Sequence, residues 1–374
     1  MDRKKKKKMW IPFLLAVLGF GLAIFIVFPS GKENPEPYCD ETGAPVAGSI
    51  SEKIWVDING SQQGMFLKGK DTTNPILLFL TGGPGVPDYF LAKEIDTGLE
   101  DDFTVCYWDY RGTGLSYSPD CNAEDCTTVQ FVQDAIAVTD YLRERFGHEK
   151  IYLLGHSFGT YIGLLAAQAA PDKYCAYIAM SQISDQPQSE LLAYNTMKAE
   201  YAARGNQKMV QKLENYQTDT ADTAWLRRWF AAPERDTAMH ELGGGTTAAM
   251  KSVITGIFFP TLRCTDYTQA ERIRIWQGKA FVQQTQVAYD RMEFVAAESV
   301  PELEIPVYFL AGKHDLTCCY AMQKEYYEQV KAPVKGFYTF ENSAHSPLFE
   351  QPKLALKILQ QDVQNGTTCL SDKN

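Results

Sequence analysis

The sequence contains few histidines and none of the cysteine or histidine spacings that commonly hold zinc. Five histidines and nine cysteines occur among 374 residues, and neither C-x-x-C nor H-E-x-x-H is present, so no zinc site is expected. Basic residues are also scarce, because 36 Lys and Arg stand against 46 Asp and Glu, a formal charge of −10. A nucleic-acid-binding protein needs a basic face to contact phosphates. We therefore exclude that class and predict no metal and no cofactor.

The N-terminus is the one strongly basic segment of the chain. The first 30 residues contain six Lys and Arg and one Asp, which leaves 30 basic and 45 acidic residues, a charge of −15, in the other 344. Residues 1–8 form a basic tail, and residues 9–28 contain no charged side chain. Twenty helical residues span about 30 Å, the thickness of the hydrocarbon core of a bilayer. We therefore expect a transmembrane anchor over residues 9–28.

Two localisations follow from such a segment. Lysines before the apolar run favour a single-pass membrane protein with a cytoplasmic N-terminus and an extracytoplasmic body. The alternative is a secreted body released from a signal peptide, but cleavage after Ser30 would place bulky Phe28 where a small residue is preferred. Residues 29–48 are rich in Pro and Gly and are predicted to be a linker. In an oxidising compartment, Cys121 and Cys126 are the most plausible local disulfide.

From residue 50 onward, strand-like and helix-like segments alternate. Continuous apolar runs at 76–80, 103–108 and 151–155 are typical of strands that helices cover on both faces. The chain therefore predicts an α/β fold with a mostly parallel central sheet. The sheet domain is expected to comprise two stretches with a helical cap inserted between them: residues 49–185, the cap at 186–300, and residues 301–374.

The segment G-H-S-F-G, residues 155–159, ends one of these strands and opens a helix. In that context G-x-S-x-G forms a nucleophile elbow, a tight turn that projects a serine hydroxyl from the edge of the sheet. Gly155 and Gly159 leave room for strand and helix to approach. The helix N-terminus also supplies partial positive charge where an oxyanion would form. Ser157 is therefore the predicted nucleophile.

The base that would activate Ser157 follows by elimination among the five histidines. His345 comes after the last predicted strand and emerges at the same carboxyl edge of the sheet. Asp315 leaves the preceding strand at that edge and would orient the imidazole, although it could also cap the next helix. Glu341 and Asp362 are alternatives for the acid, but the first is close to His345 in sequence and the second lies within a helix. The chain order Ser, Asp, His is that of α/β-hydrolases.

Backbone amides at the same edge would complete a site for acyl transfer. The segment T-G-G-P-G, residues 81–85, follows the strand at 76–80, and its glycines allow close approach and unusual dihedrals. We predict that the amides of Gly83 and Phe158 bind the oxyanion, with Gly82 as a further candidate donor. His156, inside the elbow, is expected to point away from the serine hydroxyl.

These motifs together resemble the prolyl iminopeptidase branch of the α/β-hydrolases. The resemblance rests on G-G-P-G at 82–85, W-D-Y-R-G-T-G-L-S at 108–116 and G-H-S-F-G-T at 155–160, followed by the Asp and His segments. It covers about residues 50–185 and 301–365. The inserted block then occupies the place of that family's helical cap.

The sequence departs from the family pattern at the site itself. Thr81 stands where the family usually has His, and His156 and Phe158 flank the serine where the family commonly has Gly and Trp. The cap carboxylates that would hold a substrate amino terminus are not evident from the sequence. Glu190 is the best candidate, and a solvated cap glutamate is its alternative interpretation.

The resemblance implies a serine aminopeptidase that releases N-terminal residues, proline in particular, from small peptides. A carboxylesterase or lipase-like hydrolase with the same triad is the alternative, and a non-catalytic binding protein of this fold is a minor one. The cap holds 13 basic and 13 acidic residues, so the acidity of the body need not reflect substrate charge. Five cap aromatics could line a pocket, although cap core is their commoner role: Trp225, Trp229, Phe230, Phe258 and Phe259. The oligomeric state is not predicted.

Overall fold

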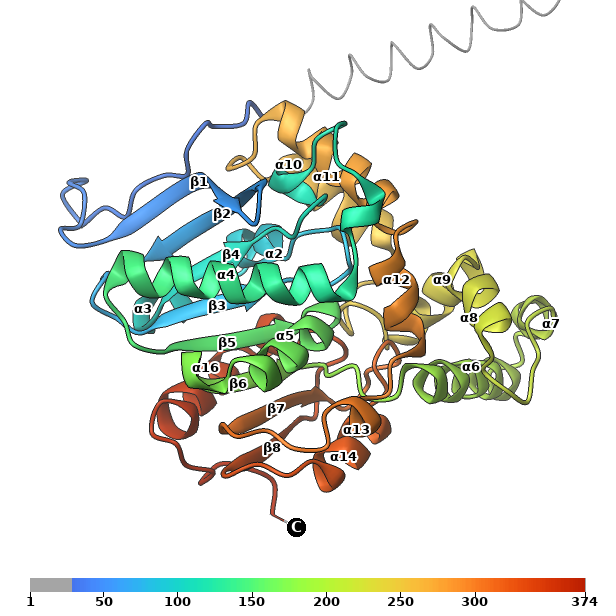
Figure 1. Ribbon diagram of the computed structural model, residues 1–374. Helices are drawn as coiled ribbons and strands as arrows, with labels where there is room; N and C mark the ends of the chain where they lie inside the picture. Colours follow the sequence, from blue (N-terminus) through green and yellow to red (C-terminus); the bar gives the residue numbers. More distant parts are fainter. Residues whose placement is uncertain (1–28, 374) are drawn as a thin grey trace, which may run out of the picture.

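The structure, a computed structural model, describes residues 29–373 (Figure 1). The expected tail and anchor, residues 1–8 and 9–28, lie outside these residues. Within 29–373 no helix combines the length and apolar character that crossing a bilayer requires. This finding contradicts the membrane localisation and the membrane association that the sequence led us to expect.

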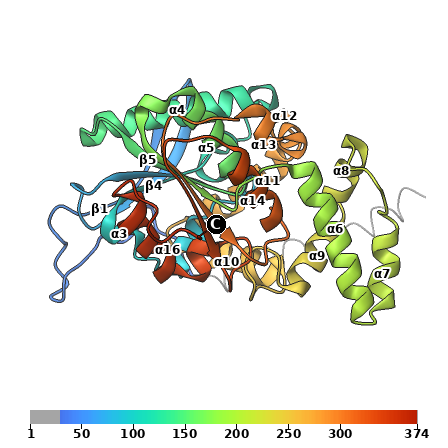
Figure 2. The ribbon, with the colours of Figure 1, turned by 90° about the horizontal axis from the view of Figure 1, so that it is seen from below.

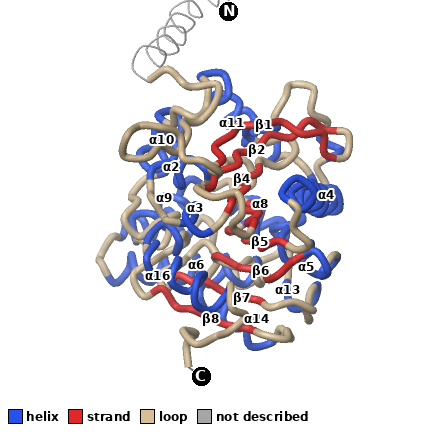
Figure 3. Tube along the Cα trace, turned by 90° about the vertical axis from the view of Figure 1, so that its left-hand side faces the viewer, coloured by secondary structure: helices blue, strands red, loops and turns tan. Residues whose placement is uncertain are grey.

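An eight-stranded sheet runs through the described residues and confirms the predicted α/β architecture. The strands lie in the order β1-β2-β4-β3-β5-β6-β7-β8, and Figure 3 labels all of them except β3 in this succession. The pairs β1·β2 and β2·β4 are antiparallel, and the other pairs are parallel. The strands are β1 (Ile50–Ile58), β2 (Ser61–Gly69), β3 (Ile76–Leu80), β4 (Thr104–Trp108), β5 (Ile151–His156), β6 (Tyr174–Met180), β7 (Val307–Gly312) and β8 (Lys335–Phe340).

The helices fall between the strands and in one long block between β6 and β7. Short 3₁₀ and π segments connect some of them, including η5 (Arg291–Glu293). The helices are α2 (Tyr89–Glu94), α3 (Leu99–Asp102), α4 (Thr128–Phe146), α5 (Phe158–Ala169), α6 (Gln186–Ala203), α7 (Gln207–Glu214), α8 (Thr223–Phe230), α9 (Pro233–Leu242), α10 (Phe259–Arg263), α11 (Gln269–Val282), α12 (Gln286–Asp290), α13 (Ala296–Ser299), α14 (Tyr320–Gln329), α15 (Pro347–Glu350) and α16 (Pro352–Ile358).

Helices cover both faces of the sheet, which explains the apolar runs of its central strands. Figure 2 shows α4 and α5 on one face and α3 and α16 on the other. Every residue of β3 and β4 is buried between these layers. A strand with no solvent-facing side needs no polar alternation, so the continuous apolar runs in the sequence identified these strands correctly.

The block between β6 and β7 divides into two parts. Helices α6–α9 project to one side of the sheet (Figure 1) and share a core of their own, in which the rings of Trp225 and Trp229 stack with centroids 5.8 Å apart. The later helices return to the sheet domain. There the amide of Val287 donates to the carbonyl of Cys126 (3.1 Å). The two tryptophans are thus core residues of the outer part.

Residues 29–48 lie against the body at several points. Arg272 Nη1 in α11 donates to the carbonyl of Pro29 (2.8 Å). Lys53 Nζ in β1 donates to the carbonyl of Lys32 (3.0 Å) and forms a buried ion pair with Glu271 (2.8 Å). This segment, predicted as a linker, is therefore fastened to β1 and α11 at its start.

All nine cysteines lie within the described residues, and all are free. The predicted Cys121–Cys126 disulfide is not formed. Cys121 Sγ instead accepts a hydrogen bond from the amide of Ser118 (3.3 Å), and Cys126 Sγ donates to the carbonyl of Asn122 (3.8 Å).

Candidate active site

Ser157 stands at a sharp turn between β5 and α5. Its backbone has φ 52° and ψ −116°, a conformation that L-residues rarely adopt and that the strained turn of a nucleophile elbow requires. The Ser157 amide donates to the carbonyl of Met180 at the end of β6 (3.0 Å) and fixes the turn to the sheet. The serine is only 8% exposed, and it lines a cavity.

Two glycines permit this close approach of β5 and α5. A Cβ added at Gly159 would lie 2.0 Å from the carbonyl oxygen of Leu80 in β3, and one at Gly155 would lie 2.5 Å from the carbonyl oxygen of Gly159. Both distances are far below van der Waals contact. The G-x-S-x-G spacing is thus a packing requirement of this turn as well as a sequence signal.

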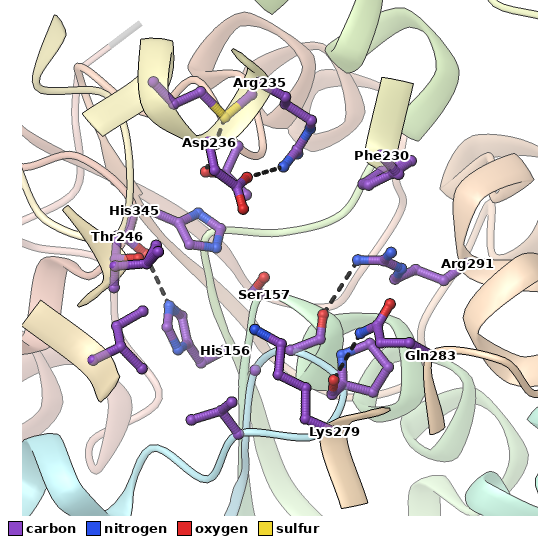
Figure 4. A pocket seen from close by; sticks show the side chains of 18 of the residues that line it. His156, Ser157, Phe230, Arg235, Asp236, Thr246, Lys279, Gln283, Arg291 and His345 are labelled. Atoms are coloured by element: carbon purple, nitrogen blue, oxygen red, sulfur yellow. Dashed lines mark hydrogen bonds and ion pairs between the residues drawn. The ribbon is translucent and has the colours of Figure 1, made fainter. Parts of the chain in front are cut away.

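His345 and Asp315 meet as the chain order predicted. His345 Nδ1 and Asp315 Oδ2 are 2.9 Å apart, and both residues are buried. His345 and Ser157 line the same cavity, and Figure 4 shows both side chains there. The two side chains are not hydrogen-bonded to each other in this structure, and such contacts often tighten only when substrate binds.

The Asp315 carboxylate is held by the start of the following helical turn. Its Oδ1 accepts hydrogen bonds from the amides of Thr317 (2.8 Å) and Cys318 (2.9 Å), so the cap-like role and the contact with His345 coexist. Asp362, an alternative acid in the sequence, instead accepts from the hydroxyl of Tyr338 (2.8 Å) and from amides near the C-terminus.

The loop after β3 contains two of the predicted oxyanion donors, Gly82 and Gly83. Of these two, only the Gly83 amide is free of a hydrogen bond to another loop residue. Gly83 lines the cavity and has φ 111°, a conformation open to glycine. The Gly82 amide donates to Asp88 Oδ2 (2.8 Å), so it is already engaged. The predicted pair Gly83 and Phe158 fits this geometry better than the further candidate Gly82, because Phe158 opens α5 and its amide has no partner within the helix.

His156 braces this loop, a role that the sequence did not suggest. Its Nδ1 is 2.8 Å from Asp88 Oδ2 and its Nε2 is 2.9 Å from the carbonyl oxygen of His345. Both partners accept hydrogen bonds, so a doubly protonated imidazolium satisfies both. Burial alone would lower the pKa of His156, but the Asp88 carboxylate raises that pKa above its ordinary value. Burial opposes ionisation of Asp88, yet His156 and the Gly82 amide hold the pKa of Asp88 below its usual range.

This pair predicts a pH-dependent contribution to stability. A raised histidine pKa stabilises the fold fully below the unfolded value of about 6.5, and the contribution is lost as pH rises through the folded pKa. The lowered pKa of Asp88 stabilises above about pH 4 and is lost at lower pH. We expect His156→Gln to cost about 3 kcal/mol at pH 5.5 and clearly less at pH 8.5.

Urea unfolding at both pH values measures the difference. The matched control is His148→Gln, a partly exposed histidine before β5 at the opposite end of that strand, which should change little at either pH. An equal loss of stability for His156→Gln at pH 5.5 and 8.5 would show that the imidazolium does not form.

The structure does not bring Glu190 to the cavity. Its carboxylate is fully buried in α6 and accepts hydrogen bonds from Arg235 Nε (2.8 Å), Trp229 Nε1 (3.0 Å) and Gln186 Nε2 (2.9 Å). Arg235 neutralises its charge through a second contact as well. Glu190 therefore holds α6 and α9 together and is not placed to receive a substrate amino group.

The cavity has a volume of about 600 Å³ and lies between the edge of the sheet and the inserted helices. The sheet domain contributes Gly83, Ser157 and His345. The inserted block contributes the residues that sequence reasoning missed, and Figure 4 shows their charged ends around the serine. Phe230, one of the cap aromatics that the sequence offered as pocket lining, also lines the cavity. The charged residues that sequence reasoning missed include Arg235, Asp236, Lys279 and Arg291. No local motif marks these four, because they come from three separate helical segments.

Within residues 29–373, no three His, Cys, Asp or Glu side chains are grouped in a way that could hold a metal ion. Ser157, His345 and Asp315 are side chains of the types that serve as nucleophile, base and acid, and the loop after β3 and the start of α5 bring backbone amides beside them. Such a set supports acyl transfer through a covalent intermediate.

Fold, topology and family profile agree on the class of protein. The profile of the alpha/beta hydrolase fold matches residues 75–352, so the chain belongs to the α/β-hydrolase family. A relative from Bacillus subtilis (strain 168), named "Probable aminopeptidase YbaC", is 30% identical over 331 residues, which cover 86% of this chain and 99% of the relative. "Proline iminopeptidase PfmaB" from Pestalotiopsis fici is 33% identical over 127 residues, 33% of this chain and 41% of that protein.

A solved structure shows the same fold. The proline iminopeptidase of Mycobacterium smegmatis superposes with a TM-score of 0.62 at 17% identity, covering 84% of this chain and 98% of that one. The family expected from the sequence is thus confirmed at the level of an α/β-hydrolase with similarity to aminopeptidases and proline iminopeptidases.

Proposed function

We propose that the protein is a serine hydrolase that works through an acyl-enzyme. Ser157 Oγ attacks the substrate carbonyl carbon while His345 Nε2 takes the hydroxyl proton. The amides of Gly83 and Phe158 stabilise the oxyanion. The bond to the leaving group then breaks, and the same proton passes to that group. Water, deprotonated by His345, attacks the acyl-enzyme, releases the acid and restores the serine.

The observation that carries this proposal is the convergence of three side chains from three strand ends. Ser157 follows β5, Asp315 follows β7 and His345 follows β8. The 2.9 Å contact between His345 Nδ1 and Asp315 Oδ2 fixes one ring nitrogen as the donor, which leaves Nε2 to act as base. Ser157 and His345 line the same cavity, and Asp315 contacts His345.

For the substrate, we propose hydrolysis of an amide at the amino end of a short peptide. The support is the name of the relative from Bacillus subtilis, which aligns along 86% of this chain. With Glu190 engaged by Arg235, the carboxylate left to meet a substrate ammonium at the cavity is Asp236. Its side chain is 56% exposed and contacts Arg235 Nη1 (2.8 Å).

Hydrolysis of carboxylic esters is the second candidate. It is favoured by the engagement of Glu190, because the carboxylate expected to recognise a free amino terminus is committed to an ion pair with Arg235. An ester substrate requires the same nucleophile, base and oxyanion donors and does not require an ammonium-binding carboxylate.

The two substrate classes separate in one panel of assays. Aminoacyl 4-nitroanilides, with proline among them, are compared with 4-nitrophenyl esters of short acids. The peptidase proposal expects turnover of the anilides, and Asp236→Asn should raise their KM while leaving ester KM almost unchanged. Ester turnover without any anilide turnover would reject the peptidase proposal and retain the esterase.

A further inference from the structure

Within the described part of the chain, three cations that line the cavity form no ion pair: Arg227, which is exposed, and the less exposed Lys279 of α11 and Arg291 of η5. Arg235, on the same cavity, pairs with both Glu190 and Asp236. Burial lowers the pKa of Lys279. Burial, with the neighbouring charge of Arg235, lowers the pKa of Arg291 to about 10, so Arg291 stays charged at neutral pH.

Arg291 lies directly beside the proposed oxyanion loop. Its Nη1 donates to the carbonyl oxygen of Gly83 (3.2 Å), and its guanidinium carbon lies 4.7 Å from the centroid of the Phe230 ring. Arg235 lies over the same ring at 4.6 Å. Arg291 is only 8% exposed, and its buried Nε makes no hydrogen bond with any described residue.

None of the nearby carboxylates that the structure describes forms an ion pair with Arg291 or Lys279. Asp290, the neighbour of Arg291 in sequence, accepts hydrogen bonds from Thr128 (2.6 Å) and Gln286 (2.6 Å). Glu190 and Asp236 contact Arg235, and Asp88 is held by His156. Among the described residues, no carboxylate lies within ion-pair distance of the Lys279 ammonium or the Arg291 guanidinium, and the charges of Asp236 and Glu190 act on them only from further away.

Lys279 of α11 lines the same cavity. Its backbone packs so closely on the oxyanion loop that a Cβ at Gly85 would lie 2.7 Å from Lys279 Cα. Figure 4 shows the Lys279 and Arg291 side chains both extending into the cavity around Ser157. Lys279 is half-buried, and its Nζ also lies 5.3 Å from the centroid of the Trp276 ring. A buried cation with no carboxylate beside it is costly to a fold, so the retention of Arg291 beside the proposed nucleophile indicates a ligand of opposite sign.

We infer that the cavity selects acyl compounds that carry an anionic group, a carboxylate or a phosphate, close to the bond that is cleaved, and that Arg291 and Lys279 bind this group. In a peptide the group would be an acidic side chain or the free carboxylate of a very short chain. This inference rests on the proposed serine hydrolase. It adds a preference for a negatively charged substrate, which neither the sequence motifs nor the resemblance to iminopeptidases indicates.

A bracing role for Arg291 alone explains less of the geometry. One nitrogen contacts Gly83, and a neutral donor such as glutamine could make that bond without burying a charge. Charge-assisted hydrogen bonds contribute about 1.5–3 kcal/mol, or roughly 10- to 100-fold in binding. We therefore expect a preference of that size for an anionic substrate over its uncharged match.

The test compares two substrates that differ only in charge: the mono-4-nitrophenyl ester of glutaric acid and the same compound with its free carboxylate methylated. If the protein cleaves only anilides, the corresponding 4-nitroanilides replace them. Wild type should favour the anionic member by about 10- to 100-fold in kcat/KM. Arg291→Gln should remove most of that ratio, Lys279→Gln part of it, and Arg291→Lys should retain more of it than Arg291→Gln. Arg274→Gln, which removes an exposed charge from α11, should leave the ratio unchanged.

The ratio of kcat/KM for the two substrates is taken within each variant. A general loss of activity lowers both values equally and leaves this ratio unchanged. A wild-type ratio of one or less would overturn the inference, and so would a ratio that survives in both Arg291→Gln and Lys279→Gln. If Arg291→Gln does not fold, Lys279→Gln alone decides. Free glutarate and glycerol 3-phosphate, used as competitive inhibitors of wild type, distinguish a carboxylate from a phosphate by the stronger inhibition. Hydrolysis that survives in Ser157→Ala would instead reject the proposed function.

Discussion

Ser157→Ala is expected to abolish hydrolysis. Removing the nucleophile of a serine hydrolase lowers kcat by about 10⁴- to 10⁶-fold, because the remaining acid, base and oxyanion donors cannot form the acyl-enzyme. The variant should also fail to react with a fluorophosphonate probe, which modifies the activated serine of wild type. Mass spectrometry of the labelled protein would place the adduct on the peptide that contains Ser157.

The fold should survive this change. The Ser157 side chain makes no hydrogen bond with the described residues, so its loss removes no structural contact. The matched control is Ser184→Ala, another buried serine, whose hydroxyl donates to the carbonyl of Gln182 (3.3 Å). It should keep both labelling and turnover. Equal labelling of Ser157→Ala and wild type would remove Ser157 as the nucleophile.

Gly159→Ala is expected to destabilise the protein by about 3 kcal/mol or more. The new methyl would lie 2.0 Å from the carbonyl oxygen of Leu80, which is backbone in the fully buried strand β3 and cannot rotate away. Overpacking of a rigid core typically costs about 1–3 kcal/mol, and a clash with backbone lies at the upper end or beyond. Because the shift would fall on the elbow, turnover should decline together with the free energy of unfolding.

Gly163→Ala, one helical turn further along α5, is the comparison. Its methyl would meet side-chain atoms of Tyr177 (3.0 Å) and Leu80 (3.1 Å), which can yield by small rotations. Alanine also favours the helix over glycine by about 1 kcal/mol. We expect its unfolding free energy to stay within about 1 kcal/mol of wild type. Urea denaturation of both variants is the measurement, and equal effects would contradict the packing argument.

Local signals predicted most of the sheet domain. Apolar runs located β3, β4 and β5 because strands buried on both faces carry no polar alternation. The sharp turn at Ser157 was predicted from the five consecutive residues 155–159. Asp315 and His345 followed because the carboxyl ends of neighbouring parallel strands meet at one edge, so chain order was enough to place them.

The rest of the site depends on contacts that no local pattern records. Arg291 and Gly83 touch although 208 residues separate them, and Glu190 is neutralised by Arg235, 45 residues away. A glutamate at the start of a cap helix looks the same in sequence whether it faces solvent, substrate or an arginine. The sequence shows that a histidine precedes Ser157, but it does not show that this histidine pairs with Asp88. That contact exists only once the loop after β3 has folded.

The division of the molecule has an evolutionary consequence. In the proposed mechanism the nucleophile, base and acid all come from the sheet domain, whereas Arg235, Asp236, Lys279 and Arg291 all come from the block between β6 and β7. The two proposals thus assign reactivity and selectivity to separate stretches of the gene. Mutation can therefore change which acyl group is accepted without disturbing the elbow, and duplicated copies of such a gene can diverge in substrate while sharing one chemistry.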